Sequence, residues 1–265
     1  MEELHTEAFV LRTRPFSESD VITVLLTRER GKISGIAKGA RRSRRRFAGG
    51  ALEPFQEIRV RLSQRPQRSL AFVHESRVTQ SHRRVAEDLK VYAWACYLLE
   101  LTDAVTPEND PCPDLYDLFK HTMAGLADGA GTVGPEPLAH HFILGLLEEA
   151  GWAPNLASCT TCGQAITEQT RPLLHPDGHG LVCSGHEAER QGLVADDPSF
   201  RPSRRIIFPE LLTYLCEAAV KVPAQPTTEV GQAATLLLER LVDLHLAKPL
   251  KARTFLAEMN QAESA

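Results

Sequence analysis

The chain reads VITVLLT over residues 21–27 and ISGIA over residues 33–37, with Arg30-Gly31-Lys32 between the two runs. The first run is apolar and rich in β-branched residues, and the second alternates as a strand does. The glycine between the runs marks a turn of the chain. These residues therefore predict two neighbouring strands near the start of the sequence.

Three more strands are predicted around this pair. One runs through Ala8-Phe9-Val10-Leu11 within residues 5–12, and another covers residues 70–78. In the third, residues 55–62, apolar and charged side chains alternate, so that each kind faces one side. Five short strands within about 80 residues suit a small barrel, for which the five-stranded oligonucleotide-binding (OB) fold is the natural candidate.

The hydrophobic period changes from about residue 82 onward. Val85, Leu89, Tyr92, Cys96 and Leu99 are spaced by three or four positions, which marks one apolar helix face. The same reasoning predicts further helices over residues 114–126, 135–150, 209–220 and 230–247, with a frayed tail at 262–265.

The predicted fold class is therefore α+β with several domains. An N-terminal five-stranded OB-fold barrel spans residues 1–80, and an all-α domain follows it. That helical domain has two parts, residues 81–155 and 191–265, and a zinc-finger-like segment is inserted between them at residues 156–190.

The composition is typical of a globular protein rather than of a disordered or membrane-spanning one. Hydrophobic residues make up 43% and charged residues 24% of the 265 positions, which is enough for a globular core. No apolar run approaches the ~20 residues that span a bilayer. The first five residues are acidic and no apolar stretch follows them, so they do not have the pattern of a secretory signal. We therefore expect a cytoplasmic protein without a membrane partner.

The net charge of −4 hides an asymmetry between the two ends of the chain. Residues 1–85 hold 18 Lys and Arg against 9 Asp and Glu, a net charge of +9. The remainder holds 12 against 25, a net charge of −13. A basic segment joined to an acidic one indicates a polyanion-binding module attached to a second region.

A basic cluster lies within the predicted barrel. Arginines there can neutralise phosphates and give salt-dependent nucleic-acid binding, and Phe47, Phe55 and Phe72 are candidates for stacking on bases. The alternative interpretation is a solvated loop beside phenylalanines of the core. A smaller group, Arg201, Arg204 and Arg205, either extends the nucleic-acid path or decorates a helix start. The predicted DNA-binding residues are Lys32, Lys38, Arg41, Arg42, Arg44, Arg45 and Arg46.

A second pattern predicts a metal. Cys159-x-x-Cys162 is answered by Cys183-x-x-His186, and four such groups can surround one zinc ion tetrahedrally. Four protein ligands leave no open position, so the predicted Zn²⁺ is structural. His175 and His179 lie in the same loop and leave the identity of the fourth ligand open. The alternative is three unrelated cysteines and a surface histidine.

Catalytic patterns are scarce in the sequence. Gly31-Lys32 lacks the upstream glycine of a phosphate-binding loop, so no ATP site is indicated. No serine elbow, His-Glu-x-x-His motif or close carboxylate pair stands out. We therefore predict that the protein is not an enzyme, and we rank a nuclease or transferase low.

Several blocks, in order along the chain, resemble the RecO family of bacterial recombination mediators. The first blocks are EAFVLR at residues 7–12, SESDVITVL at 17–25 and AKGARR at 37–42, followed by LEPF at 52–55. Later blocks are GWAP at 151–154, the Cys159–Gly163 knuckle and LHLAKPLKAR at 244–253. His186 stands where many zinc-bearing relatives have a fourth cysteine.

The resemblance implies an OB barrel followed by a helical domain that carries the zinc segment. It also implies DNA repair and recombination functions: binding of single- and double-stranded DNA, annealing of complementary strands, and help in loading RecA. The implied partners are RecR and single-stranded DNA-binding protein, and the implied location is the nucleoid. A zinc-stabilised RNA-binding or ribosome-associated factor is the main alternative, because a basic barrel fits both classes.

Overall fold

The computed structural model separates into two compact units, residues 1–135 with 250–265 and residues 136–249. The predicted second basic group, Arg201, Arg204 and Arg205, lies outside the described part of the chain. The residues that the structure describes are 2–64, 69–129, 133–167, 170, 172–186 and 207–262.

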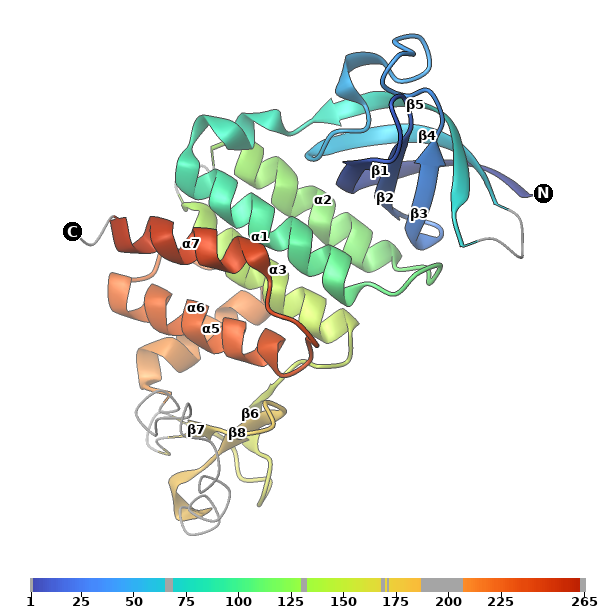
Figure 1. Ribbon diagram of the computed structural model, residues 1–265. Helices are drawn as coiled ribbons and strands as arrows, with labels where there is room; N and C mark the ends of the chain where they lie inside the picture. The colour runs from blue at the N-terminus through green and yellow to red at the C-terminus, as the bar shows by residue number, and fades with distance from the viewer. Residues whose placement is uncertain are drawn as a thin grey trace. The chain divides into compact units, whose positions relative to one another are not determined.

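Five strands form the N-terminal part of the first unit (Figure 1). β1 pairs antiparallel with both β2 and β4, β2 pairs with β3, and β3 meets β5 in a short parallel pair. With β4 beside β5, the order β1-β2-β3-β5-β4 returns to β1 as a closed barrel. The five predicted strands are confirmed. Their bounds are β1 Glu2–Pro15, β2 Val21–Thr27, β3 Gly31–Ala37, β4 Gln56–Gln64 and β5 Ala71–Ser81.

Alternating apolar residues of these strands fill the barrel. In β4 the predicted inward face is buried, and Arg59 on the opposite face is exposed, which is the period of two that a half-buried strand requires. β2 is buried along its whole length, so both of its faces are covered by protein. The barrel core includes Ala8, Val10, Leu25, Ile33, Ile58, Val60, Leu62 and Val73.

Helices complete the first unit. Asp88 caps α1 by accepting the amides of Lys90 and Val91, both at 2.9 Å. α1 lies beside α7 (Figure 1), a helix that the sequence pattern did not predict. The bounds are η1 Ala48–Gly50, η2 Arg83–Glu87, α1 Leu89–Val105, α2 Pro113–Ala127 and α7 Lys251–Ala262.

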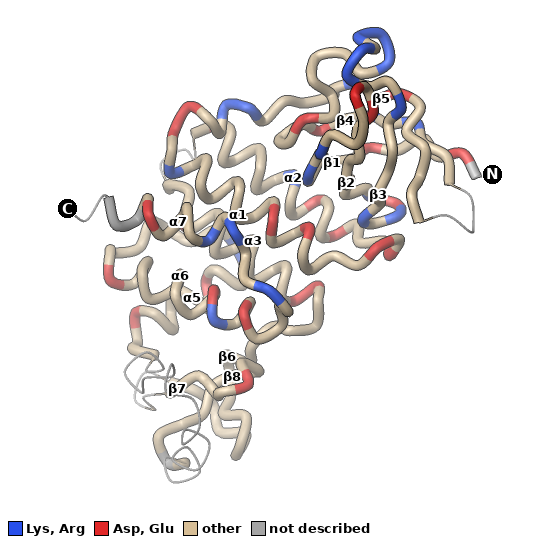
Figure 2. The backbone as a smooth tube through the Cα atoms, in the orientation of Figure 1, with Lys and Arg blue, Asp and Glu red and all other residues tan. Residues whose placement is uncertain are grey.

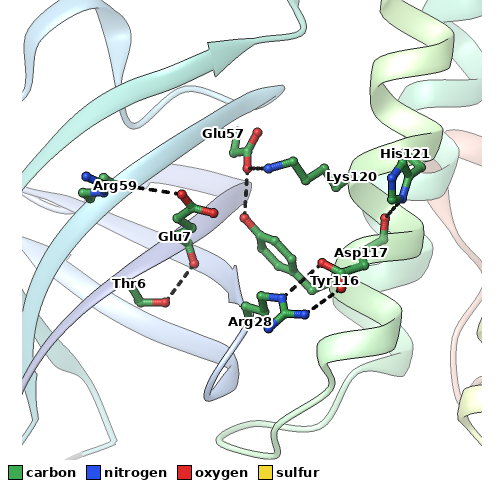
Figure 3. Close-up of polar contacts among 9 residues, drawn as sticks. All are labelled: Thr6, Glu7, Arg28, Glu57, Arg59, Tyr116, Asp117, Lys120 and His121. Atoms are coloured by element: carbon green, nitrogen blue, oxygen red, sulfur yellow. Dashed lines mark hydrogen bonds and ion pairs between the residues drawn. The ribbon is translucent and has the colours of Figure 1, made fainter.

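A buried polar network joins the barrel to α2 (Figure 3). The Glu57 carboxylate is only 2% exposed and accepts hydrogen bonds from the Tyr116 hydroxyl at 3.2 Å and from the Lys120 ammonium. Outside this buried network, Arg28 after β2 donates two bonds to the Asp117 carboxylate, at 3.1 and 2.8 Å, and forms an exposed ion pair with it. Because a buried carboxylate needs such partners, this network fixes α2 against β4.

In the second unit, the described residues form the helices α3, α5 and α6 and a small sheet. His140 joins the helices, since its Nδ1 lies 2.9 Å from the Tyr214 hydroxyl and its Nε2 lies 2.9 Å from the Thr235 hydroxyl. The sheet has the order β6-β8-β7 and, apart from Asn155, lies within the segment predicted to be zinc-finger-like, residues 156–190. The bounds are α3 Pro135–Glu149, β6 Asn155–Cys159, β7 Leu173–Leu174, β8 Gly180–Val182, η4 Ser184–His186, α5 Pro209–Val220 and α6 Thr228–Asp243.

The C-terminal part of the chain differs from the sequence-based prediction in two ways. The last predicted helix, residues 230–247, ends earlier, because α6 stops at Asp243. A separate helix, α7, then occupies residues that were expected to lead into a tail. Among the described residues, no helix combines the length and the hydropathy that a bilayer crossing requires.

Candidate nucleic-acid interface and metal centre

The basic cluster lies in one loop after β3, residues 38–46, which we call the basic loop (Figure 2). Gly39 turns the chain at φ +65°, a conformation that favours glycine, and its amide donates to the Asp20 carboxylate at 2.9 Å. That bond lowers the pKa of Asp20 below its ordinary value. The Arg41 amide donates to the Ser19 carbonyl at 3.1 Å, so the loop is held against the turn between β1 and β2.

Arg46 closes the basic loop from within. Its guanidinium donates to the Lys38 carbonyl at 2.7 Å and lies 5.2 Å from the centre of the Phe47 ring. The Arg46 carbonyl accepts the Ser76 amide at 2.9 Å, which joins the loop to β5. This arginine therefore has a structural task in addition to its charge.

The remaining arginines of the loop face solvent. Arg42 makes an exposed ion pair with Glu18 at 3.0 Å, a kind of pair that contributes little to stability and is easily exchanged. Arg44 and Arg45 are exposed, and within the described part of the chain neither makes an ion pair. Lys38, Arg41, Arg42, Arg44 and Arg45 thus present their charge outward from a loop with a fixed backbone.

Lys32 has a different setting from the rest of the predicted DNA-binding set. Its side chain is 12% exposed, and its ammonium donates to the Asp103 carbonyl and lies 3.6 Å from the Asp103 carboxylate. The same carboxylate accepts from Arg12 at 2.6 Å. Lys32 is therefore engaged within the first unit, between β3 and α1.

The three phenylalanines predicted to stack on bases all pack against other residues of the protein. Phe47 is buried in the barrel core, the Phe55 ring packs 5.7 Å from Tyr92, and the Phe72 ring lies 4.8 Å from His74. Phe16, which the sequence reasoning missed, is 61% exposed in the turn that the basic loop contacts. The signal for it was available, since a phenylalanine between Pro15 and a polar turn has no strand neighbours to cover it.

The strands beside the basic loop add two arginines. Arg59 of β4 and Arg77 of β5 are opposite each other in register, and both are exposed. Like charges directly opposite each other are unfavourable in a sheet, unless an anion lies over them. The Arg59 guanidinium lies 3.5 Å from the carboxylate of Glu7 on β1, which offsets part of this repulsion, and both arginines add exposed cations to the outside of the barrel. The alternating sequence of β4 predicts that Arg59 faces outward, but only the register between β4 and β5 shows that it lies opposite Arg77.

The four predicted metal ligands lie together in the second unit. Cys162 Sγ is 3.9 Å from Cys183 Sγ, and His186 Nδ1 is 3.2 Å from Cys183 Sγ and 4.0 Å from Cys159 Sγ. All six cysteines are free thiols. Cys159 ends β6 and Cys162 follows in the next turn, whereas Cys183 lies between β8 and η4 and His186 ends η4. β6 pairs directly with β8.

The spacing of these atoms fits one tetrahedral ion. Ligands at about 2.3 Å for sulfur and 2.0–2.1 Å for nitrogen place two sulfurs about 3.8 Å apart and a sulfur and a nitrogen about 3.6 Å apart. The observed distance between the Cys162 and Cys183 sulfurs, 3.9 Å, agrees with the expected sulfur–sulfur distance. The two observed sulfur–nitrogen distances, 3.2 and 4.0 Å, lie on either side of the expected one. Three thiols and an imidazole are the donor set that a structural zinc ion prefers, so the quartet can hold such a metal.

Backbone amides favour the thiolate form of Cys159, the first cysteine of the quartet. Burial raises the pKa of the Cys159 thiol, but amides of Cys183, Cys162 and Thr161 outweigh it and lower that pKa to about 6. The thiolate, rather than the thiol, is the form that binds metal. His175 and His179, the other candidates for the fourth ligand, belong to a separate group with Asp177.

The fold and the two sites define a class: an α+β protein with a basic five-stranded barrel and a Cys/His quartet in its second unit. Two family models match the chain, Recombination protein O N terminal over residues 1–82 and Recombination protein O C terminal over residues 86–254. The chain therefore belongs to the Recombination protein O family.

Relatives support the same assignment over nearly the full length. A protein of Anaeromyxobacter sp. (strain Fw109-5) is 32% identical, with 97% of each chain covered, and one of Myxococcus xanthus (strain DK1622) is 32% identical, with 98% of this chain and 99% of its own. One of Symbiobacterium thermophilum is 39% identical over 72% of this chain and 74% of its own. All three carry the name DNA repair protein RecO.

Proposed function

We propose that this protein is a recombination mediator in DNA repair and acts without catalysing a covalent reaction. It binds single- and double-stranded DNA, anneals complementary strands and, with RecR, helps to load RecA onto DNA coated by single-stranded DNA-binding protein. Family membership supports the repair role. The observation that supports this DNA-binding surface is the basic loop, whose fixed backbone presents Arg41, Arg42, Arg44 and Arg45 to solvent.

The physical mechanism is charge screening. Two complementary strands repel each other, and outward cations on a fixed loop reduce that repulsion while releasing counterions from both strands. Arginines on a pinned backbone lose little conformational freedom when they bind, whereas their solvated side chains can pass from one phosphate to the next. Such a surface lowers the barrier to pairing and requires no ATP.

The test is annealing of complementary oligonucleotides that are precoated with single-stranded DNA-binding protein, in the absence of ATP. We expect acceleration over the uncatalysed control, and we expect most of it to be lost in the R41Q/R42Q/R44Q/R45Q variant. Arg46 stays in place in this variant because it closes the loop. The smaller R44Q/R45Q variant removes two exposed arginines that make neither an ion pair nor a side-chain hydrogen bond among the described residues.

The matched control is the K221Q/K248Q variant, which removes two exposed cations of the second unit. Its annealing rate should equal that of the parent protein. Loss of annealing in both double variants would show a nonspecific charge effect. Unchanged annealing in the four-arginine variant would refute the assignment of the basic loop.

We also infer that the Cys/His quartet holds a structural Zn²⁺. The ion would join the β6 knuckle to η4, and Cys159, Cys162, Cys183 and His186 would be its ligands. After dialysis against a weak chelator, the untagged chain should keep about one zinc per chain. The Cys162→Ser variant should keep far less and unfold at a lower temperature, whereas Cys216→Ser, at a free thiol outside the quartet, should match the parent.

An RNA-binding role is the rival that a competition experiment separates. Matched single strands of DNA and RNA, offered together, should bind with similar affinity or with a preference for DNA, since backbone charge dominates the surface. A clear preference for RNA would require contacts to the 2′-hydroxyl groups. That result would favour an RNA-binding or ribosome-associated role over the recombination-mediator function.

A further inference from the structure

A second group of metal-type side chains lies at the tip of the turn between β7 and β8. His175, Asp177 and His179 each offer a ligand atom, and these three atoms lie within 4.8 Å of one another. The two imidazole rings have their centres 4.2 Å apart, and the Asp177 carboxylate is 3.6 Å from His175 Nδ1. None of the three belongs to the Cys/His quartet.

The backbone of this turn is fixed before any ligand arrives. The His175 amide donates to the Gly180 carbonyl at 2.8 Å, and the Gly178 amide donates to the His175 carbonyl at 2.9 Å. Gly178 adopts φ +78° and lies against α6 and the residue after it, so that an added Cβ would clash with a Leu244 methyl. A tight turn anchored in this way holds its three side chains on one side at little entropic cost.

The donor set selects the kind of ion. Two imidazoles and one carboxylate suit Zn²⁺ and its transition-metal neighbours, whereas Ca²⁺ and Mg²⁺ prefer oxygen ligands throughout. Bonds of about 2.0–2.2 Å place the donors of one ion within about 4 Å of each other, so a small rotation of exposed Asp177 and His179 closes the site. Only three protein ligands are supplied, which leaves a coordination position for water or another oxygen.

We propose that His175, Asp177 and His179 form a second metal site, separate from the quartet, for a divalent transition ion of the zinc class. The site has an open coordination position and weaker, exchangeable binding, because Asp177 and His179 are exposed and none of the three ligands is a thiolate. This proposal does not depend on the DNA-mediator function.

Cobalt distinguishes the two sites by colour. Co²⁺ bound by thiolates has intense sulfur-to-metal charge-transfer absorption, and Co²⁺ bound by nitrogen and oxygen has only weak bands. The metal-free, untagged full chain is titrated with Co²⁺, and bound metal is counted together with absorbance. We expect two equivalents: a tight one that brings the charge-transfer band and a weaker one that leaves that band unchanged.

Three variants test the assignment. H175A/H179A should lose the weaker equivalent and keep the charge-transfer band, and Asp177→Asn, which preserves the shape of the turn, should weaken the second equivalent at least tenfold. H5A/H121A removes two exposed histidines of the first unit and should bind as the parent does. Binding of two equivalents by H175A/H179A would overturn the proposal.

Two other outcomes would also overturn it. A parent chain that takes up only one Co²⁺, and shows the charge-transfer band with it, has no second site. Loss of the charge-transfer band in H175A/H179A would instead mean that these histidines serve the quartet. Failure of the quartet itself appears differently, as a weak equivalent with no charge-transfer band in the parent chain.

Discussion

Single arginines of the basic loop have two distinct tasks. The Arg46 guanidinium donates a hydrogen bond to the Lys38 carbonyl and lies over the Phe47 ring, so this arginine stabilises the conformation of the loop. Arg44 and Arg45 project from the loop that Arg46 closes. Neutralising Arg46 would therefore mix a change of loop conformation with a loss of charge, which is why the functional variants leave it intact.

Phe16 provides a prediction for base stacking at the residue scale. Its ring is 61% exposed in the turn held against the basic loop, and stacking of one base on an aromatic ring contributes about 1–3 kcal/mol. Phe16→Ala should weaken single-strand binding about fivefold and leave duplex binding almost unchanged, because duplex bases are already stacked. Fluorescence anisotropy with matched oligonucleotides measures both, and Phe16→Tyr is the control. Equal losses for single and double strands would exclude stacking.

His140 provides a pH prediction. Burial lowers its pKa to about 3, so the folded protein keeps it neutral while the unfolded chain takes up a proton near pH 6.5. The free energy of unfolding should therefore fall as the pH falls below 6.5, by about 1 kcal/mol between about pH 7.5 and about pH 5.5 from this group. His140→Gln should remove that part of the slope in urea unfolding.

The control for this experiment is His121→Gln, at an exposed histidine of α2. It should leave the pH slope of the parent unchanged. The same slope in the parent and in His140→Gln would mean that His140 titrates alike in the folded and unfolded chains.

At the scale of elements, α7 shows how tertiary contacts create a helix. Half of its twelve residues are polar, and the periodicity of its apolar residues did not by itself predict a helix. The Glu100 carboxylate of α1 accepts the amides of Lys251 at 3.0 Å and Ala252 at 2.7 Å, which satisfies two donors at the start of the helix. Leu256 is buried, and Phe255 lies edge-on to Tyr92. A residue 151 positions away thus acts as the cap.

Glu100 therefore carries an element-scale prediction. Glu100→Ala should destabilise the protein by about 1 kcal/mol, which is the usual cost of losing a helix cap, and α7 should fray first. Hydrogen exchange at residues 251–256 measures the fraying, and Glu100→Gln, which keeps an acceptor, should lose less. Protection in α7 that stays at the parent level in Glu100→Ala would show that packing of Leu256 is sufficient.

The whole molecule carries its charge unevenly. The overall value of −4 would discourage DNA binding, but residues 1–85 carry +9 and display much of it on one loop and the strands beside it. Because exposed charges are screened within about 10 Å at 0.1 M salt, a bound strand responds to the local surface rather than to the total.

The salt dependence of DNA binding tests whether the local basic surface, rather than the net charge of the protein, determines affinity. Each phosphate contact on single-stranded DNA contributes about 0.7 to the slope of log affinity against log salt. The R41Q/R42Q/R44Q/R45Q variant should reduce the steepness of that slope by about 3, and K221Q/K248Q should leave it unchanged. A variant that binds more weakly with the parent's slope would have lost something other than phosphate contacts.

The sequence by itself determined the local elements and the ligand types. Alternation predicted the five strands, helical spacing predicted α1, α2, α3 and α5, and Cys/His spacing predicted the quartet, because these signals depend on neighbours in the chain. Only the tertiary structure decided which residues meet across long separations. It engaged Lys32 with Asp103, opposed Arg59 to Arg77, capped α7 with Glu100 and grouped His175 and His179 apart from the quartet. Such contacts follow from packing and strand register, which no local pattern encodes.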